Sequence, residues 1–294
     1  MAYYTPQEIM KMSAEVGFKK SKLPVWTVLI LGFLGGAFIS LGFLADIRVI
    51  GTAPKEMGSL AGFFGAAIFP VGLMLTLLAG AELLTGNMMT MAAALFSKKI
   101  GIMQLLKNWA LVLISNFVGA VAVAYFFGHV VGLTEGDFLA KTLAIAHAKV
   151  HDSFVEAFIS AIGCNWLVCL AVWIAYGSKD SFGKYAGIFF PIMAFVAIGF
   201  QHVVANMFVI PAAIFAGSDI TWLQYVENFV PVFLGNVVGG AIFVGLAYFL
   251  AFRYTMDATA APTELSAVTA TPASTKQNIA LSEADVSNTR VVKH

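Results

Sequence analysis

The sequence has few charged side chains. Aspartate, glutamate, lysine and arginine make up 11% of its 294 residues, whereas a soluble domain usually carries about 25%. Hydrophobic residues make up 60%, so the chain has too few polar side chains to cover its surface in water. A net charge of +1 also excludes the basic surface that binds nucleic acid. These shortages indicate a protein that lies in a lipid bilayer.

Cysteine is equally rare. The sequence has two, Cys164 and Cys169, and their spacing points them about 140° apart on a helix, so they cannot form a disulfide. We interpret both as small buried apolar residues. His147 and His151 have the spacing of one helical turn, but no third ligand is evident, and we expect neither a metal site nor a cofactor.

The sequence is rich in long apolar segments. A helix needs about 20 residues to span a bilayer, and six apolar runs reach that length: 26–45, 60–85, 108–128, 154–176, 186–216 and 227–252. The second and fifth runs are long and contain polar residues, which predicts that these two helices are broken. The sequence therefore predicts an all-α membrane protein with six transmembrane helices.

The distribution of lysine predicts the orientation of these spans. Lysines gather in the N-terminal segment and in the second–third and fourth–fifth connections, whereas the other connections mix lysine with acidic residues. Because cytoplasmic loops carry the excess of positive charge, we expect both termini in the cytoplasm, in a multi-pass protein of the inner or plasma membrane. Residues 25–254 form the six-span domain, and residues 255–294 are expected to be a disordered cytoplasmic tail.

The polar N-terminal segment, residues 1–24, contains a helix start and no signal peptide. Thr5, Pro6 and Glu8 match a capping box with proline at the first helical position. Gly17 is expected to end this helix. We predict an amphipathic helix on the cytoplasmic interface of the membrane, and a soluble helix without membrane contact is the alternative.

An internal repeat divides the six spans into two halves. The matching positions are Gly80, Glu82, Asn87, Met88, Asn108 and Asn116 in the first half and Gly199, Gln201, Asn206, Met207, Asn228 and Asn236 in the second. Each half holds three spans, an odd number, so the second half must be inverted relative to the first. This predicts an inverted 3+3 repeat.

Polar residues and glycine mark where the second and fifth helices are expected to break. They are Thr85, Gly86 and Asn87 in the second span and Gln201, His202, Ala205 and Asn206 in the fifth. Irregular backbone at membrane depth lies against protein or a watery cavity, so these residues are candidates for lining a path. In the alternative, the asparagines only join helices by hydrogen bonds.

Four segments resemble the formate/nitrite transporter family: residues 84–87, 149–151, 165–173 and 199–211. The resemblance runs from about residue 10 to residue 254 and is strongest to formate channels. It implies an aquaporin-like protomer in a homopentamer, with one pore per protomer. It also implies two apolar constrictions that flank a histidine, and formate or a similar small anion as substrate.

The resemblance also assigns roles by motif position. His202 would be the central histidine, Thr85 the threonine of the flexible break, Lys149 the vestibule lysine and Asn165 the asparagine near the outer constriction. The constriction residues would be Phe69, Leu73 and Phe195 on the inner side and Leu83 on the outer side. Gln201 departs from the glutamate of many relatives, which puts a role of that carboxylate in proton supply in doubt, and we expect no adjacent carboxylate to replace it.

His202 is the candidate for proton exchange. Intramembrane ionisable groups are costly and point to function, and an ordinary imidazole titrates near neutral pH. The repeat predicts that Thr85 meets the imidazole across the axis between the halves. In the alternative, His202 is a neutral, hydrogen-bonded core residue. Glu82 is expected to be structural, because a carboxylate in an anion path would repel the substrate.

These residues predict a channel for small monovalent weak-acid anions, not an enzyme. Lys149 would attract the anion, and protonation involving His202 would give a neutral acid that crosses the constrictions cheaply. Passage as the anion stays open, as does nitrite or hydrosulfide as the substrate. An aquaporin-type channel for neutral solutes is the second alternative, but neither break reads Asn-Pro-Ala and no span holds an arginine.

Overall fold

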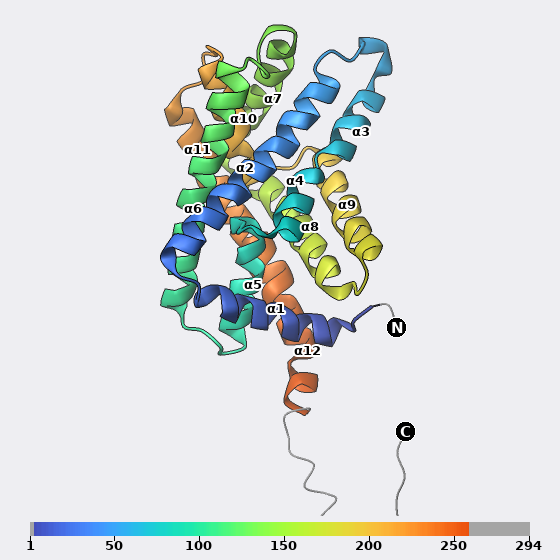
Figure 1. Cartoon of the computed structure of the whole chain (residues 1–294), viewed down its shortest axis with the longest axis vertical. Helices are drawn as coiled ribbons and strands as arrows, with labels where there is room; N and C mark the ends of the chain where they lie inside the picture. Colours follow the sequence, from blue (N-terminus) through green and yellow to red (C-terminus); the bar gives the residue numbers. More distant parts are fainter. Residues whose placement is uncertain (1–2, 259–294) are drawn as a thin grey trace, which may run out of the picture. The chain divides into compact units, whose positions relative to one another are not determined.

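A computed structural model describes residues 3–258, which are helical apart from short connections (Figure 1). The six membrane-spanning stretches are α2 (Val25–Ile50), α3 to η2 (Ser59–Gly80), α6 with η3 (Ile102–Val130), α8 (Phe154–Gly177), α9 (Ser181–Ile198) and α11 to α12 (Trp222–Arg253). This confirms the six predicted spans.

The spanning stretches contain several shorter elements. They are α3 (Ser59–Ile68), α4 (Val71–Met74), η2 (Leu75–Gly80), α6 (Ile102–Ala122), η3 (Val123–Val130), α11 (Trp222–Val237), η5 (Val238–Leu246) and α12 (Ala247–Ala258). The remaining elements are α1 (Pro6–Ser21), η1 (Lys55–Met57), α5 (Leu84–Phe96), η4 (Gly136–Phe138), α7 (Leu139–His151) and α10 (Val203–Phe215).

The second and fifth spans each end at an interruption that a shorter helix, α5 or α10, follows. The first interruption follows Gly80, with φ of +89°, and ends where α5 begins; the second follows Ile198 at Gly199, with φ of +85°, and ends where α10 begins. Left-handed backbone of this kind favours glycine, so these glycines end the helices. The predicted break at Thr85 to Asn87 is therefore wrong in position, because those residues lie in the first turn of α5.

The asparagines after each break hydrogen-bond back into it. Asn87 Nδ2 donates to Glu82 Oε2 at 2.6 Å, and Asn206 Nδ2 donates to Gln201 Oε1 at 2.7 Å. Asn206 thus lies within α10 and not in the break, as Asn87 lies within α5. Both asparagines act on the break through their side chains.

A second pair of asparagines pairs the free backbone groups of the breaks. Asn116 accepts from the Leu84 amide at 2.9 Å and donates to the Glu82 carbonyl at 2.9 Å. Asn236 accepts from the Val203 amide at 2.9 Å and donates to the Gln201 carbonyl at 3.2 Å. Buried backbone groups need such partners, so the internal repeat is preserved as a repeated set of hydrogen bonds.

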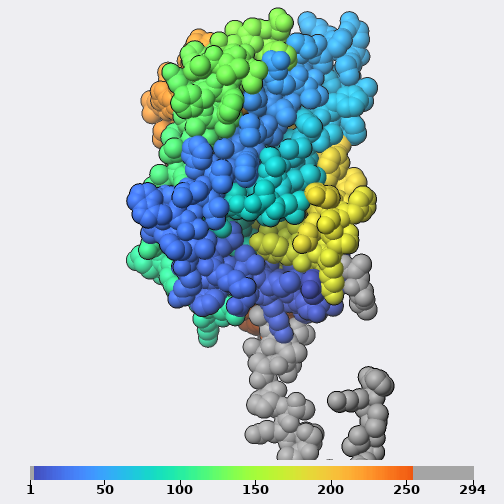
Figure 2. All heavy atoms as spheres, viewed as in Figure 1, coloured from blue at the N-terminus to red at the C-terminus, as the bar shows by residue number. Residues whose placement is uncertain are grey.

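Helix α1 lies across one end of the bundle, beside α5 and α8 (Figures 1 and 2). The predicted capping box is present: Thr5 Oγ1 accepts from the Glu8 amide, and the Glu8 carboxylate accepts from the Thr5 amide at 2.7 Å. The prediction that Gly17 ends the helix is wrong. Gly17 is buried against the Thr90 carbonyl of α5, where a Cβ would collide, so glycine here permits close helix packing.

The tail prediction lies mostly outside the described residues. Residues 255–258 belong to α12, so the expected tail begins later than residue 255, and residues 259–294 are outside the part that the structure describes.

Candidate functional site

The centre of the site is a contact between the two broken spans. His202 precedes α10 and Thr85 is in the first turn of α5; His202 Nε2 and Thr85 Oγ1 are 3.0 Å apart. Both side chains are buried. The predicted His202–Thr85 contact is therefore present.

The hydrogen bonds of His202 fix its protonation in this structure. Its Nδ1 accepts from the Ala205 amide at 3.1 Å and so caps α10. Because Nδ1 is an acceptor, a neutral ring carries its proton on Nε2, and that N–H donates to Thr85. Both ring nitrogens are occupied, and a second proton on Nδ1 would require that the bond to Ala205 breaks.

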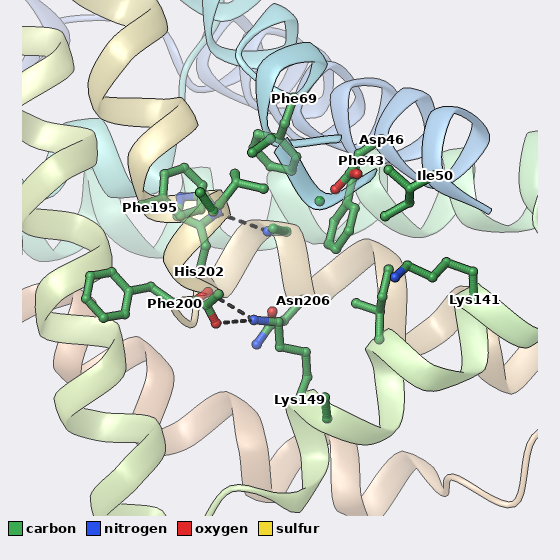
Figure 3. Close-up of a pocket in the computed structure, with 18 of the residues that line it drawn as sticks. Phe43, Asp46, Ile50, Phe69, Lys141, Lys149, Phe195, Phe200, His202 and Asn206 are labelled. Carbon is green, nitrogen blue, oxygen red and sulfur yellow. Dashed lines mark hydrogen bonds between the residues drawn. The ribbon is translucent and has the colours of Figure 1, made fainter. Parts of the chain in front are cut away.

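A cavity of about 400 Å³ opens on one side of His202 (Figure 3). Its charged or titratable lining residues are Asp46, Lys141, Lys149 and His202, and its apolar lining includes Phe43, Phe69 and Phe195. We call this the outer cavity, after the orientation that the lysine distribution predicts. Lys149 and His202, two residues that the sequence assigned to one path, therefore border the same space.

Aromatic rings close the outer cavity. The Phe69 and Phe195 rings meet edge to face with centroids 5.5 Å apart, and the Phe195 ring lies 5.7 Å from the His202 ring. A small void behind them is lined by Leu73, Leu83 and His202. Figure 3 shows Phe69 and Phe195 beside His202.

Two leucines lie on the other side of that void. Leu73 and Leu83 line a second small space together with Lys20 of α1. Phe69 and Phe195 are thus on the Lys149 side of His202, and Leu83 is on the α1 side. The expected grouping of Leu73 with Phe69 and Phe195 is therefore wrong, because Leu73 lies with Leu83. Which pair faces the cytoplasm depends on the orientation in the membrane, which stays a prediction.

Lys149 lines the outer cavity and reaches the end of α9. Its Nζ donates to the carbonyl oxygens of Gly199 at 2.9 Å and Phe200 at 3.0 Å. A cation there complements the negative end of the helix dipole. Burial lowers the pKa of the Lys149 ammonium, and the nearby Asp152 carboxylate opposes that shift.

Asn165 is buried on α8 behind Thr85. Its Nδ2 donates to the backbone carbonyls of Asn236 at 2.6 Å and Thr85 at 3.3 Å. Asn165 therefore supports the backbone of Thr85. Gly86 follows Thr85 in the sequence. A Cβ placed on Gly86 would lie 3.6 Å from Val172, its one close neighbour among the described residues, so the start of α5 is not tightly packed there.

A carboxylate does lie next to Gln201, contrary to expectation. Gln201 Nε2 donates to Asp152 Oδ2 at 2.6 Å and to the Lys149 carbonyl at 3.1 Å. Sequence reasoning missed Asp152 because the 149–151 motif ends one residue before it. Its position directly after that motif was the available signal.

The first half holds a charged counterpart of this arrangement. Lys20 Nζ binds Glu82 Oε1 at 2.8 Å and Asn87 Oδ1 at 2.7 Å. Glu82 is structural, as expected, but its partner is a lysine of α1 that the sequence did not single out. Glu82 and Gln201 occupy matching positions in the repeat, but only Glu82 carries a charge. That difference was the available signal that Glu82 needs a cationic partner.

The profile of the formate/nitrite transporter family matches residues 7–250 of the chain. A Bacillus subtilis (strain 168) protein described as uncharacterized transporter YrhG is 64% identical over 254 residues, which cover 86% of this chain and 95% of that protein. The formate channel BtFdhC of Bacillus thuringiensis is 59% identical over 253 residues, covering 86% of this chain and 97% of that one.

Solved structures agree with these matches. One described as an FNT family ion channel has a TM-score of 0.78 at 26% identity and covers 83% of this chain and 98% of its own. A pentameric formate channel with formate bound has a TM-score of 0.69 at 28% identity and covers 78% and 98%. These relatives are transporters and channels rather than enzymes. Since the family profile spans most of the sequence, the chain belongs to the formate/nitrite transporter family.

Proposed function

We propose that the protein is a membrane channel for small monovalent weak-acid anions, with formate as its main substrate. The observation that carries this is the outer cavity: two lysines line it, and it ends at two phenylalanine rings next to the His202–Thr85 pair. The name of the relative BtFdhC supports formate as the substrate.

The apolar closure of the path favours a neutral crossing species. Moving a bare carboxylate into a medium of low dielectric costs about 20 kcal/mol in the idealised Born limit. Lys141 and Lys149 raise the local concentration of the anion in the cavity. Protonation then gives an acid that passes Phe69, Phe195, Leu73 and Leu83 without that cost.

His202 and Thr85 are proposed as the groups that exchange hydrogen bonds and protons with the permeating acid. Their 3.0 Å contact sits between the phenylalanine side and the leucine side of the path. Thr85 accepts from His202 and keeps its own hydroxyl proton for a substrate oxygen. Proton uptake by His202 requires that its bond to Ala205 opens first.

The proposal extends to the surroundings of the protomer. We propose an aquaporin-like arrangement of two inverted halves, a homopentamer, and a place in the plasma membrane with both termini in the cytoplasm. The repeated asparagine contacts support the halves, the pentameric relative supports the assembly, and the lysine distribution supports the orientation.

Radiolabelled formate uptake into proteoliposomes tests the function. We expect saturable uptake above that of protein-free liposomes, with competition by unlabelled nitrite and hydrosulfide that ranks the substrates. Water permeability measured in the same vesicles by light scattering separates the aquaporin-type alternative. Fast water flux without formate uptake would refute the anion channel.

A further inference from the structure

Asp46 is a buried carboxylic acid on the wall of the outer cavity. It is near the C-terminal end of α2 and only 5% exposed. Its Oδ1 meets no hydrogen-bond donor in the described part of the chain. Figure 3 shows its carboxyl group beside Phe43 and Phe69, at the entrance side of the ring closure.

The fold makes room for this carboxyl group. Gly65 of α3 packs against it, and a Cβ at Gly65 would collide with Asp46 Oδ1. Burying a polar group without a hydrogen bond costs about 1–3 kcal/mol, and more for a charged one. Asp46 is buried despite this cost and borders a cavity on the path. Such a carboxyl group points to a role in the transfer of protons or the binding of ligands.

Two cations share the cavity with Asp46. The charged or titratable side chains on the elements packed against α2 are Lys107 of α6, Tyr125 and His129 of η3, and Lys141, His147, Lys149 and His151 of α7. Of these, Lys141 and Lys149 line the outer cavity, and the charge of Lys141 acts on Asp46. A small anion in the cavity therefore meets positive charge from α7 and a carboxyl group from α2.

His202 cannot be the first acid that the anion meets. Its Nδ1 carries no proton because it accepts from Ala205, and its Nε2 proton is donated to Thr85. A neutral imidazole that gave up this proton would become an imidazolate. His202 can pass on a proton only after it has received one, so the first proton comes from another group on the cavity.

We propose that Asp46 is the acid that protonates the incoming anion in the outer cavity, before the anion reaches Phe69 and Phe195. The O–H bond of the Asp46 carboxylic acid breaks, and an O–H bond forms on an oxygen of the anion. The neutral acid moves on, and a hydronium ion from the solution at the cavity mouth gives its proton to the Asp46 carboxylate and becomes water. This inference rests on the proposed anion-channel function.

Uptake measured against external pH tests the role of Asp46. Purified wild type, Asp46→Asn, Asp46→Glu and Asp137→Asn are compared in proteoliposomes, with formate uptake and internal pH recorded together. Asp137 is an exposed carboxylate of η4 outside the cavity lining, so its variant is the matched control. Asp46→Asn keeps the size and polarity of the side chain but removes the proton.

We expect Asp46→Asn to lower uptake at acidic external pH at least about tenfold and to flatten its pH dependence. A positioned acid contributes roughly 10²–10⁴-fold, and water replaces part of this. Asp46→Glu keeps the pH response, and Asp137→Asn matches wild type. If Asp46→Asn does not assemble, Asp46→Ser, which is smaller and does not titrate, takes its place.

Two results overturn the proposal. One is an assembled Asp46→Asn protein with wild-type uptake across the pH range. The other is a rise of uptake at neutral pH with unchanged uptake at acidic pH, because Asp46 would then only repel the anion. Absence of formate uptake in wild type refutes the channel function itself, so the two failures are distinguishable.

Discussion

At the scale of single residues, His202 is both a helix cap and a titratable group, and one substitution separates these two roles. In His202→Asn the amide oxygen still accepts from the Ala205 amide, since asparagine is among the best N-cap residues. Asparagine cannot titrate. We therefore expect an assembled channel whose formate uptake has an altered pH dependence between about pH 5 and 8, around the ordinary titration range of imidazole.

Proteoliposome uptake over that pH range measures the effect, and size-exclusion chromatography checks assembly. Thr85→Val serves as the companion variant, because it removes the hydroxyl that accepts from His202 and leaves the Ala205 bond intact. If His202→Asn follows the wild-type pH profile, His202 is a structural cap and no more.

Lys149 acts through its charge on the anion concentration in the cavity. Lys149→Gln keeps donors for the Gly199 and Phe200 carbonyls but removes the charge. A charge at about 4 Å in water is worth about 1 kcal/mol, so we expect a roughly fivefold loss of uptake at low formate and low salt. The loss should shrink above physiological salt, where screening acts within about 8 Å.

The pH response of this lysine has a definite sign. Burial lowers the pKa of Lys149, so its positive charge is lost at lower pH than that of an exposed lysine. Wild-type uptake at low salt should therefore fall on the alkaline side, and this fall should be smaller in Lys149→Gln, where only protonation of the anion still depends on pH. Lys55→Gln, an exposed lysine outside the cavity lining, is the control. If formate uptake by wild type, Lys149→Gln and Lys55→Gln depends equally on salt, the role of Lys149 is contradicted.

Site residues that belong to a local sequence motif could be predicted. Contacts between residues that are far apart in the sequence could not, except where the repeat relates them. The motif around His202 and the repeat together predicted the Thr85 contact. Asp46 was missed because the first apolar run was ended at residue 45, whereas α2 continues to Ile50. The family resemblance supplied the expected constriction residues, but it grouped Leu73 with Phe69, whereas Leu73 lies beside Leu83.

At the scale of elements, α1 is attached to the first break by a buried ion pair. Lys20→Met leaves the Glu82 carboxylate, whose side chain is 6% exposed, without its cation. Breaking one partner of a buried pair costs about 3–5 kcal/mol. We expect a lower unfolding temperature and faster hydrogen exchange of α1, measured by thermal scanning and mass spectrometry, whereas Lys19→Met at an exposed position changes little.

The second half of the chain suggests how to reverse that loss. Gln201 accepts from Asn206 there in the same geometry as Glu82 from Asn87, without a charge on the side chain. Lys20→Met combined with Glu82→Gln should therefore recover much of the stability. A double variant as unstable as Lys20→Met would show that the ion pair is not what Lys20 contributes.

The number of membrane-spanning helices could be predicted because each one corresponds to a long apolar run in the sequence. All six apolar runs correspond to a span in the structure. The ends of helices were harder, because glycine has opposite meanings in different places. Gly80 and Gly199 end helices with positive φ, whereas Gly17 lies inside α1 and permits close approach to α5. The pattern of a single sequence does not distinguish a glycine that ends a helix from one that permits close helix packing.

At the scale of the whole molecule, the orientation in the membrane is open to direct labelling. Cys164 and Cys169 are both buried, so the native chain offers little background to a membrane-impermeant maleimide. We expect Glu56→Cys to react from outside intact cells and Ser181→Cys only in inside-out vesicles, because the lysine distribution puts the α8–α9 connection in the cytoplasm. The reverse pattern would invert the proposed topology.

The proposed pentamer is supported by the relative that is pentameric. Val155, Ile159 and Trp166 form an exposed stripe along α8, and the Trp166 ring packs on Phe243 of η5, centroids 4.8 Å apart. An exposed apolar stripe of this kind faces either lipid or a neighbouring protomer. The cavity lies within one protomer, so we expect the path to run through each protomer and not between protomers. Native mass spectrometry from mild detergent should give five copies of the chain, and a stable trimer or tetramer would refute this.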